Sequence, residues 1–287
     1  DGSTQVIDGT AQKNWINYSG LALTGADARN YRIDSTAKGL GEITPLAIDA
    51  DKFKVNGADA AKVYDGSSAY HLEAGKKLAP HAGLIGTDAN NIEFEMDGDG
   101  KFTDDNGAEK SNTFDATRVS YKVKAKTGIG NERLLGNYTL NGKTLDSGTI
   151  GVSGKGTITR RTLNLNLVQN SGIEKVYDGN SSLTGGGRNW NALTETDVNG
   201  NVAYTTGSQK LVDDGTGLAI TSNYVEGAAA DQNVRRDGAG NVVNKDIRYD
   251  IAITGGDARN YFFEKNGVKT DAENGLTLTA TGKITPK

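Results

Sequence analysis

The chain has 287 residues without a single cysteine, and its 32 Lys and Arg against 36 Asp and Glu give a net charge of −4. The missing cysteines exclude disulfides and cysteine zinc sites, and the acidic balance without a basic cluster argues against a nucleic-acid partner. The apolar runs span only a few residues, so we expect a soluble fragment with no signal peptide and no membrane-inserted segment.

Turn signals are dense along the whole chain. Glycine accounts for 39 residues, and Asn or Asp often precedes it directly, as in Asp65-Gly66 and Asn141-Gly142. Such pairs tolerate the positive φ that tight hairpin turns require. The sequence therefore predicts an all-β or β-rich fold of short strands with little helix. The one candidate helix, at residues 70–78, is interrupted by Gly75, which disfavours it.

Three stretches alternate apolar and polar residues, as expected for strands with one wet face. In chain order they cover residues 118–126, 162–167 and 246–254. Their apolar positions predict core residues: Val119, Tyr121, Val123, Ala125, Leu163, Leu165, Leu167, Ile247, Tyr249, Ile251 and Ile253. The glycine-rich stretches 148–159 and 185–190 predict hairpins or bulges, because no helix follows them to complete a phosphate-binding loop.

Short motifs recur at domain-sized intervals and divide the chain into units. The letters Lys-Val-Tyr-Asp-Gly occupy residues 62–66 and return at residues 175–179. An Asn-Tyr corner ends three related stretches, TGADARNY, LLGNY and TGGDARNY. Each corner is followed by a Gly-x-Ile-Thr segment that begins at Gly41, Gly156 or Gly282. The corners and the repeated turn assign structural roles to Asn30, Tyr31, Tyr64, Asp65, Gly66, Asn137, Tyr138, Tyr177, Asp178, Gly179, Asn260 and Tyr261.

This order predicts the end of one repeat at residues 1–45 and two whole repeats at residues 46–159 and 160–287. We therefore expect a fragment of a longer tandem array. Only a few residues separate the closing strand of one repeat from the opening strand of the next, which predicts a semi-rigid, elongated rod. In the repeated turn, we expect Tyr64 and Tyr177 to bury their rings beside the core while the Asp-Gly pairs turn the chain.

A family resemblance rests on the stretches KVYDGSS, KVYDGNSS, GKFTDDNG, TGGDARNY and GKITPK. They resemble the YDG-type repeat domain and its mostly β-grasp relatives, which occur in large secreted bacterial adhesins related to filamentous haemagglutinin, many exported by two-partner secretion. The resemblance spans nearly all of the chain. It implies tandem β-grasp-like modules at the outer surface of a Gram-negative bacterium or outside it, and an outer-membrane transporter for the parent protein. The middle repeat departs from the pattern at Arg160 and at LLGNY, which affects its junction rather than its fold.

One acidic stretch has the spacing of a calcium loop, with Glu95, Asp97 and Asp99 at alternate positions. The twelfth position of that loop is Asn106 instead of a bidentate glutamate, and the second whole repeat lacks the acids. We therefore favour an acidic hairpin tip over a calcium site for this stretch. We expect no other cofactor.

Residues outside the repeated motifs are where a specialised binding site could have been added. Trp15 and Trp190 lie outside them and could stack on sugar rings, although packing in the core is the alternative that we favour. The only histidines, His71 and His81, have no equivalents in the second whole repeat. We therefore expect no metal-binding or catalytic role for them.

Together these patterns favour a non-catalytic stalk or adhesion region of a large cell-surface or secreted adhesin. Such a region extends the protein from the cell and mediates attachment or biofilm contact. The alternative is a binding module for glycan or host matrix that uses the variable loops 67–99 and 180–224. Its partner would be a host or biofilm polysaccharide or a matrix protein, and we expect the fragment itself to be monomeric. We do not expect an enzyme, because the repeats share no set of acids beyond those in turns.

Overall fold

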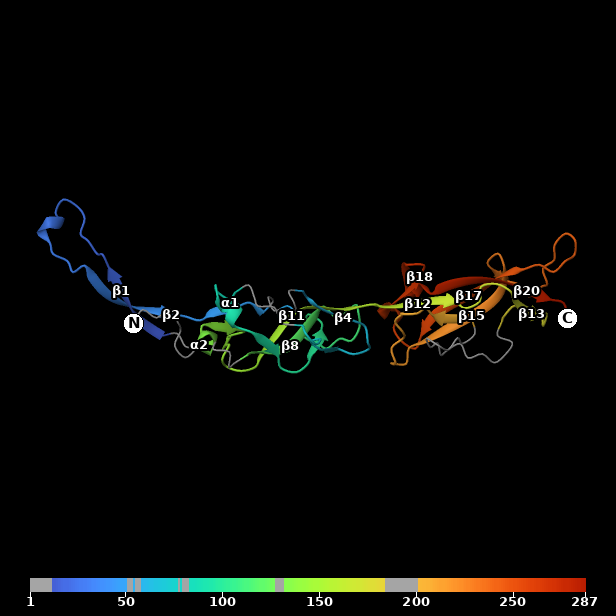
Figure 1. The fold of residues 1–287 in the computed structure, drawn as a ribbon, viewed down its shortest axis with the longest axis horizontal. Coiled ribbons are helices and arrows are strands. Elements are labelled where there is room, and N and C mark those ends of the chain that lie inside the picture. Colours follow the sequence, from blue (N-terminus) through green and yellow to red (C-terminus); the bar gives the residue numbers. More distant parts are fainter. Residues whose placement is uncertain are drawn as a thin grey trace. The chain divides into compact units, whose positions relative to one another are not determined.

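The computed structural model describes residues 12–50, 54, 58–76, 78, 83–126, 132–183 and 201–287 of the chain (Figure 1). Strands predominate in these residues, which confirms the β-rich fold that the sequence predicts. Their contacts group the chain into two compact units. Unit 1 consists of Asp1–Ala61, Ala69–Lys110 and Ala116–Thr157, and unit 2 consists of Lys62–Ser68, Ser111–Asp115 and Ile158–Lys287.

Two short segments belong to unit 2 although their neighbours in the sequence belong to unit 1. One is Lys62–Ser68, which contains the first copy of the repeated turn. The other is Ser111–Asp115, in which the backbone N–H of Thr113 donates to Asn260 Oδ1 at 3.0 Å. The compact units are therefore divided differently from the repeats that the motifs define, and the repeat boundaries stay a prediction.

The N-terminal part of unit 1 is an antiparallel hairpin of β1 (Gln12–Ser19) and β2 (Thr36–Ile43). A single 3-10 turn, η1 (Ala28–Asn30), lies in the connection. Large apolar side chains of this hairpin are exposed, namely Trp15, Ile16, Tyr18, Leu21, Leu23, Tyr31, Ile33 and Leu40. The hairpin therefore adds little to the buried core.

The rest of unit 1 contains two sheets. In the smaller one, β3 (Leu46–Ile48) runs parallel to β9 (Tyr138–Leu140), which pairs with β10 (Lys143–Thr144). The larger sheet has the order β4-β11-β8-β7-β5, with β6 also paired to β8. Its strands are β4 (Ala60–Val63), β5 (Ala69–Tyr70), β6 (Phe94–Met96), β7 (Gly100–Thr103), β8 (Arg118–Ala125) and β11 (Ile150–Thr159).

Unit 2 follows a similar plan with longer strands. One sheet has the order β14-β12-β18-β19, and β12 (Arg161–Leu167) runs parallel to β18 (Tyr261–Lys265) as β3 does to β9. The other has the order β13-β20-β17-β15-β16, of which β15, β17 and β20 lie side by side in Figure 1. The remaining elements are β13 (Ile173–Val176), β14 (Val202–Tyr204), β15 (Gly217–Glu226), β16 (Ala229–Ala230), β17 (Lys245–Thr254), η3 (Ala258–Asn260), β19 (Val268–Asp271), η4 (Ala272–Asn274) and β20 (Leu276–Thr285).

The three alternating stretches form strands, as the sequence predicts, and their apolar faces are buried. They supply β8, most of β12 and most of β17. The buried positions are Val119, Tyr121, Val123, Leu163, Leu165, Ile247, Tyr249 and Ile251. Toward the strand ends, Ala125, Leu167 and Ile253 are only half-buried. Period-two patterning therefore identifies the core correctly wherever a strand is long enough to show it.

Within the described part of the chain, α-helix is limited to two short elements, α1 (Asp88–Asn91) and α2 (Glu132–Leu135). The candidate helix at residues 70–78 does not form in the positions that the structure describes, because Tyr70 belongs to β5 and Gly75 has a φ of +81°. No helix among those residues is long and apolar enough to cross a membrane.

The glycines of the Gly-x-Ile-Thr segment let neighbouring backbones approach closely. A Cβ atom at Gly156 would lie 2.9 Å from Cβ of Val119, and one at Gly282 would overlap the backbone carbonyl of Ile173. The hairpin or bulge predicted for residues 148–159 is wrong, because Ile150–Thr159 forms one continuous strand. The other glycine-rich stretch, 185–190, lies outside the described residues.

Candidate functional site

The first copy of the repeated turn is a compact loop held by its own aspartate. Asp65 Oδ1 accepts hydrogen bonds from the backbone N–H of Ser67 at 2.9 Å and from Lys62 Nζ at 2.6 Å. Gly66 has a φ of +81°, a conformation that favours glycine. These contacts explain the order Lys-x-x-Asp-Gly, because each of the three residues has a separate role in the turn.

Tyr64 connects this turn to the core of unit 2. Its side chain is only 6% exposed, and its hydroxyl donates to Asp214 Oδ2 at 2.8 Å. Its ring meets the ring of Tyr261 edge to face, with centroids 5.4 Å apart, and its carbonyl accepts from Arg161 Nη1 at 3.0 Å. We call Lys62–Gly66 the docked turn. The surface that holds it, made of Arg161, Val212, Asp214 and Tyr261, is called the Tyr261 face.

The electrostatics of this contact agree with its geometry. Burial raises the pKa of Tyr64, and the hydrogen bond to Asp214 raises it further. Burial alone would also raise the pKa of the Asp214 carboxyl, but hydrogen bonds from Thr216 and Tyr64 outweigh it and lower the pKa. At neutral pH a neutral phenol thus donates to a carboxylate, which is a charge-assisted hydrogen bond.

The second copy of the turn has the same local geometry without the surroundings. Lys175 Nζ lies 2.8 Å from Asp178 Oδ1, the N–H of Asn180 donates to the same oxygen at 3.0 Å, and Gly179 has a φ of +79°. Tyr177, however, is 37% exposed. The predicted burial is therefore confirmed for Tyr64 and wrong for Tyr177. We call Lys175–Gly179 the exposed turn.

The three Asn-Tyr corners also differ in their surroundings. Tyr261 and Tyr138 are buried, whereas Tyr31 is 72% exposed. The hydroxyl of Tyr261 accepts from the N–H of Val212 at 3.3 Å, and that of Tyr138 accepts from the N–H of Ile85 at 3.0 Å. The structural role predicted for the corners thus holds in both whole repeats, where each tyrosine anchors a loop to a parallel strand pair.

The three candidate calcium ligands have separate partners. Glu95 pairs with Lys124 at 3.0 Å, Asp97 Oδ2 accepts from Thr149 Oγ1 at 2.9 Å, and Asp99 lies 2.7 Å from His71 Nδ1. Among the residues that the structure describes, no group of three acidic, histidine or cysteine side chains is arranged to hold a metal ion. Calcium binding at these acids stays a prediction.

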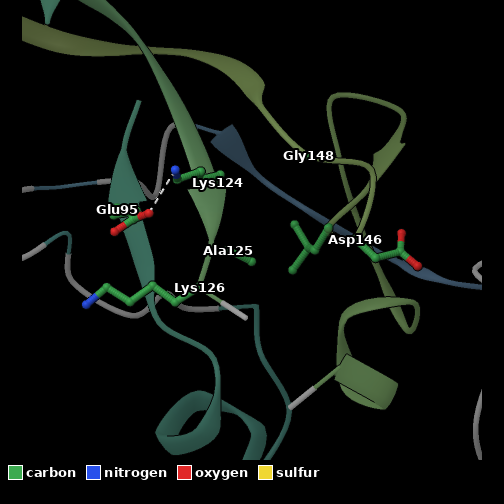
Figure 2. A pocket seen from close by; sticks show the side chains of 7 residues that line it. Glu95, Lys124, Ala125, Lys126, Asp146 and Gly148 are labelled. Carbon is green, nitrogen blue, oxygen red and sulfur yellow. Dashed lines mark ion pairs between the residues drawn. The ribbon is translucent and has the colours of Figure 1, made fainter. Parts of the chain in front are cut away.

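An open pocket lies beside the same acidic strand (Figure 2). It has a volume of about 430 Å³ and is lined by Glu95, Lys124, Ala125, Lys126, Leu145, Asp146 and Gly148. Figure 2 shows the Glu95–Lys124 ion pair on one wall, with Asp146 across the pocket and its carboxylate directed away from that pair. The hydrogen bond to Glu95 raises the pKa of Lys124. The lining combines charged side chains with the apolar Ala125 and Leu145 and contains no aromatic ring.

The candidate aromatic ligands differ from the expectation in one respect. Trp15 is 58% exposed on β1, so the packing in the core that we favoured for it is wrong. Trp190 and His81, together with part of the variable loop 180–224, lie outside the described residues.

Sequence patterns did not identify the partners of the docked turn. Arg161 stands out only as half of a basic pair, and Asp214 only as one of many Asp-Gly turns. A second example is Lys245, whose side chain is fully buried and pairs with Asp231. Asp231 belongs to a Gly-x-x-x-Asp-x-Asn segment that begins at Gly227 and also occurs from Gly100 to Asn106. The only signal available was the repetition of that segment. No family model matches this chain, and no curated protein matches it.

Proposed function

We propose that this chain is a non-catalytic extension and adhesion region of a large cell-surface or secreted bacterial adhesin. The observation that carries the proposal is the docked turn. Tyr64 lies in the first predicted whole repeat, yet its hydrogen bond to Asp214 and its ring contact with Tyr261 group it with unit 2. We propose that turns of this kind hold successive repeats of the array together, as a spacer that extends an adhesin requires.

The connections support the same proposal. Only Arg160 separates β11 from β12, and only Thr44 and Pro45 separate β2 from β3. Connections this short leave few free dihedral angles, so we propose that the tandem repeats form a semi-rigid, elongated rod of β-grasp-like modules. On this proposal the parent protein reaches the outer surface of a Gram-negative bacterium through an outer-membrane transporter.

Small-angle scattering of the whole chain tests the rod. We expect an elongated particle with one fixed maximum dimension, and a matched Tyr64→Ala variant whose distance distribution broadens. A compact profile for the unmodified chain, or a broad distribution identical in both proteins, contradicts the proposal. Deleting the corresponding region from the parent adhesin tests the proposed role in adhesion, and we expect weaker attachment of the cells with unchanged secretion of the protein.

A second candidate function is recognition of a glycan or a host matrix protein. The open pocket at Lys124 and Asp146 favours it, because carboxylates in a hollow accept hydrogen bonds from sugar hydroxyls and ammonium groups donate to them. Part of its lining, Glu95, comes from the variable loop 67–99. A glycan array with the chain and a Lys124→Ala, Asp146→Ala variant separates the two functions. If the unmodified chain binds a glycan and the variant does not, recognition is supported. If neither protein binds, the spacer function is supported.

A further inference from the structure

Unit 1 carries a surface that resembles the Tyr261 face of unit 2 in several positions. In the parallel strand pairs, Leu46 is the register partner of Tyr138, as Arg161 is the partner of Tyr261. The hydroxyl of each tyrosine accepts a backbone N–H from a loop, which comes from Ile85 in unit 1 and from Val212 in unit 2. Leu46, Ile85, Asp88 and Tyr138 are therefore called the Tyr138 face.

The acidic residue has an equivalent as well. Asp214 follows Val212 by two positions and accepts from the hydroxyl of Tyr64. Asp88 follows Ile85 by three positions, and its Oδ2 accepts from the hydroxyl of Tyr138 at 2.6 Å. A carboxylate offers about four acceptor sites, so Asp88 can accept a second phenol without releasing the first.

The two faces differ in what lies on them. A Cβ atom placed on Gly66 of the docked turn would lie 3.0 Å from Val212, so this turn sits directly against the Tyr261 face. On the Tyr138 face the equivalent apolar residue, Ile85, is 66% exposed, and Leu46 is 41% exposed. Two neighbouring aliphatic side chains above a buried tyrosine and an aspartate thus face solvent.

The chain also carries an exposed ligand of the right shape. The exposed turn repeats all five letters of the docked turn and holds the same internal hydrogen bonds. Its Val176 is 57% exposed and its Tyr177 is 37% exposed. The backbone N–H of Tyr177 donates to the carbonyl of Thr285, as that of Tyr64 donates to Thr159, so the two turns leave the closing strand in the same way.

We propose that copies of this chain associate head to tail, with the exposed turn of one copy seated on the Tyr138 face of the next. Tyr177 would place its ring edge against Tyr138 and donate its hydroxyl to Asp88, as Tyr64 does with Tyr261 and Asp214. Because the two surfaces are different and lie on different units, the contact is heterologous and each added copy presents a new exposed turn. The inference does not depend on the proposed role in adhesion.

The affinity of such a contact is low. The Tyr138 face has Leu46 where unit 2 has Arg161, so the hydrogen bond to the tyrosine carbonyl is lost. One turn on one face also buries much less than the roughly 1,000 Å² that stable interfaces require. We therefore expect the fragment to be monomeric at micromolar concentration and to associate toward about 1 mM, the effective concentration that a short linker provides.

Sedimentation of the whole chain up to about 1 mM tests the proposal. We expect the average mass to rise with concentration. Tyr177→Ala removes the ligand and Ile85→Glu places a charge on the receiving face, and each lowers the association constant by about tenfold or more. Val268→Glu is the matched control, because Val268 is similarly exposed on β19 and belongs to neither surface. The thermal melts of all variants confirm that they fold.

A mixing experiment makes the test specific. The Tyr177→Ala chain keeps the Tyr138 face and the Ile85→Glu chain keeps the exposed turn, so an equimolar mixture should form dimers while neither variant associates alone. A wild-type chain that stays monomeric at about 1 mM overturns the proposal. So does a mixture that fails to dimerise, or association that survives both substitutions and therefore uses another surface, such as the hairpin that bears Trp15.

Discussion

The docked turn and the exposed turn have the same five residues and the same contacts at their aspartate, yet one tyrosine is buried and the other is partly exposed. The difference comes from residues far away in the sequence. Tyr64 meets Asp214 and Tyr261, whereas the equivalent ring of Tyr177 has solvent over more than a third of its surface. The five-residue motif thus encodes the shape of the turn, whereas the burial of its tyrosine depends on the surface that packs against it.

The Gly-x-x-x-Asp-x-Asn turns give a second comparison of the same kind. In both, the aspartate accepts a backbone N–H two residues on, from Asn106 to Asp104 and from Asn233 to Asp231. Asp104 faces the half-exposed Lys110, whereas Asp231 pairs with the fully buried Lys245. Again the turn is repeated, whereas the position and the burial of its lysine partner differ.

The largest expected effect is that of Tyr64→Ala. Truncating this buried ring removes its contact with Tyr261 and leaves a cavity, so we expect unit 2 to lose about 3–5 kcal/mol of unfolding free energy. Urea denaturation followed by tyrosine fluorescence measures it. A loss as small as that of Tyr177→Ala would erase the distinction between the two turns.

Asp231→Ala is expected to destabilise unit 2 by about 3 kcal/mol, because it leaves the buried ammonium of Lys245 without its carboxylate. Lys245 keeps two backbone carbonyl acceptors, those of Asp231 and Asn233, which limits the loss. The matched change in unit 1, Asp104→Ala, should have a smaller effect, because Lys110 remains hydrated. Equal shifts in the thermal melts of the two variants would contradict the comparison.

Tyr64→Phe sharpens the first prediction by keeping the ring and removing only the hydroxyl. Asp214 then loses one charge-assisted hydrogen bond but stays in contact with water and Thr216, so we expect a loss of about 1–2 kcal/mol. The double variant with Asp214→Ala should cost less than the sum of the two single changes, because both remove the same bond. Additive losses would show that the two groups act independently.

Acid should weaken unit 2 through Asp231. The hydrogen bond from Lys245 holds the pKa of this carboxyl below its ordinary value of about 3.8. A carboxyl with a lowered folded-state pKa contributes stability above its unfolded pKa, and the contribution is lost as pH falls through the folded one. We therefore expect melting temperatures to be flat from about pH 7 to 5 and to fall below about pH 4. In the Asp231→Asn variant, the melting temperature at pH 7 should be lower than in the unmodified chain, and it should fall less steeply below about pH 4.

The smallest effect is expected for Tyr177→Ala. An exposed ring makes few contacts to lose, so the unfolding free energy should stay within about 0.5 kcal/mol of the unmodified chain. The same variant is expected to lose head-to-tail association, so it separates the role of this turn in binding from any role in folding. A loss of several kcal/mol would mean that the turn supports its own unit.

Much of the fold could be predicted from local pattern. Val119, Tyr121 and Val123 alternate with polar residues, and a period of two suffices to place them in the core. For the glycine of the Gly-x-Ile-Thr segment, the sequence shows only that the residue is repeated. Its physical reason, the overlap of a Cβ at Gly282 with the carbonyl of Ile173, depends on a strand more than a hundred positions away.

The site was harder to predict, because long-range pairing decides it. Glu95, Asp97 and Asp99 have the spacing of a calcium loop, but Lys124, Thr149 and His71 reach them from other segments of unit 1. Of the partners of Tyr64, Asp214 lies in a loop, whereas Arg161 and Tyr261 begin β12 and β18, and no local signal pairs any of them with Tyr64. For Trp15, the hairpin pattern predicts a strand and does not say which of its faces will be covered.

The hydrogen bond between Tyr64 and Asp214 spans 150 positions of chain. Closing so long a loop costs conformational entropy before any contact is gained, so the local hairpins of unit 2 should form first and the turn should dock last. The contacts of Tyr64 are then absent from the folding transition state and form only after it. Its truncation should speed unfolding and leave refolding almost unchanged, so that the docked turn works as a latch that sets the lifetime of the folded unit.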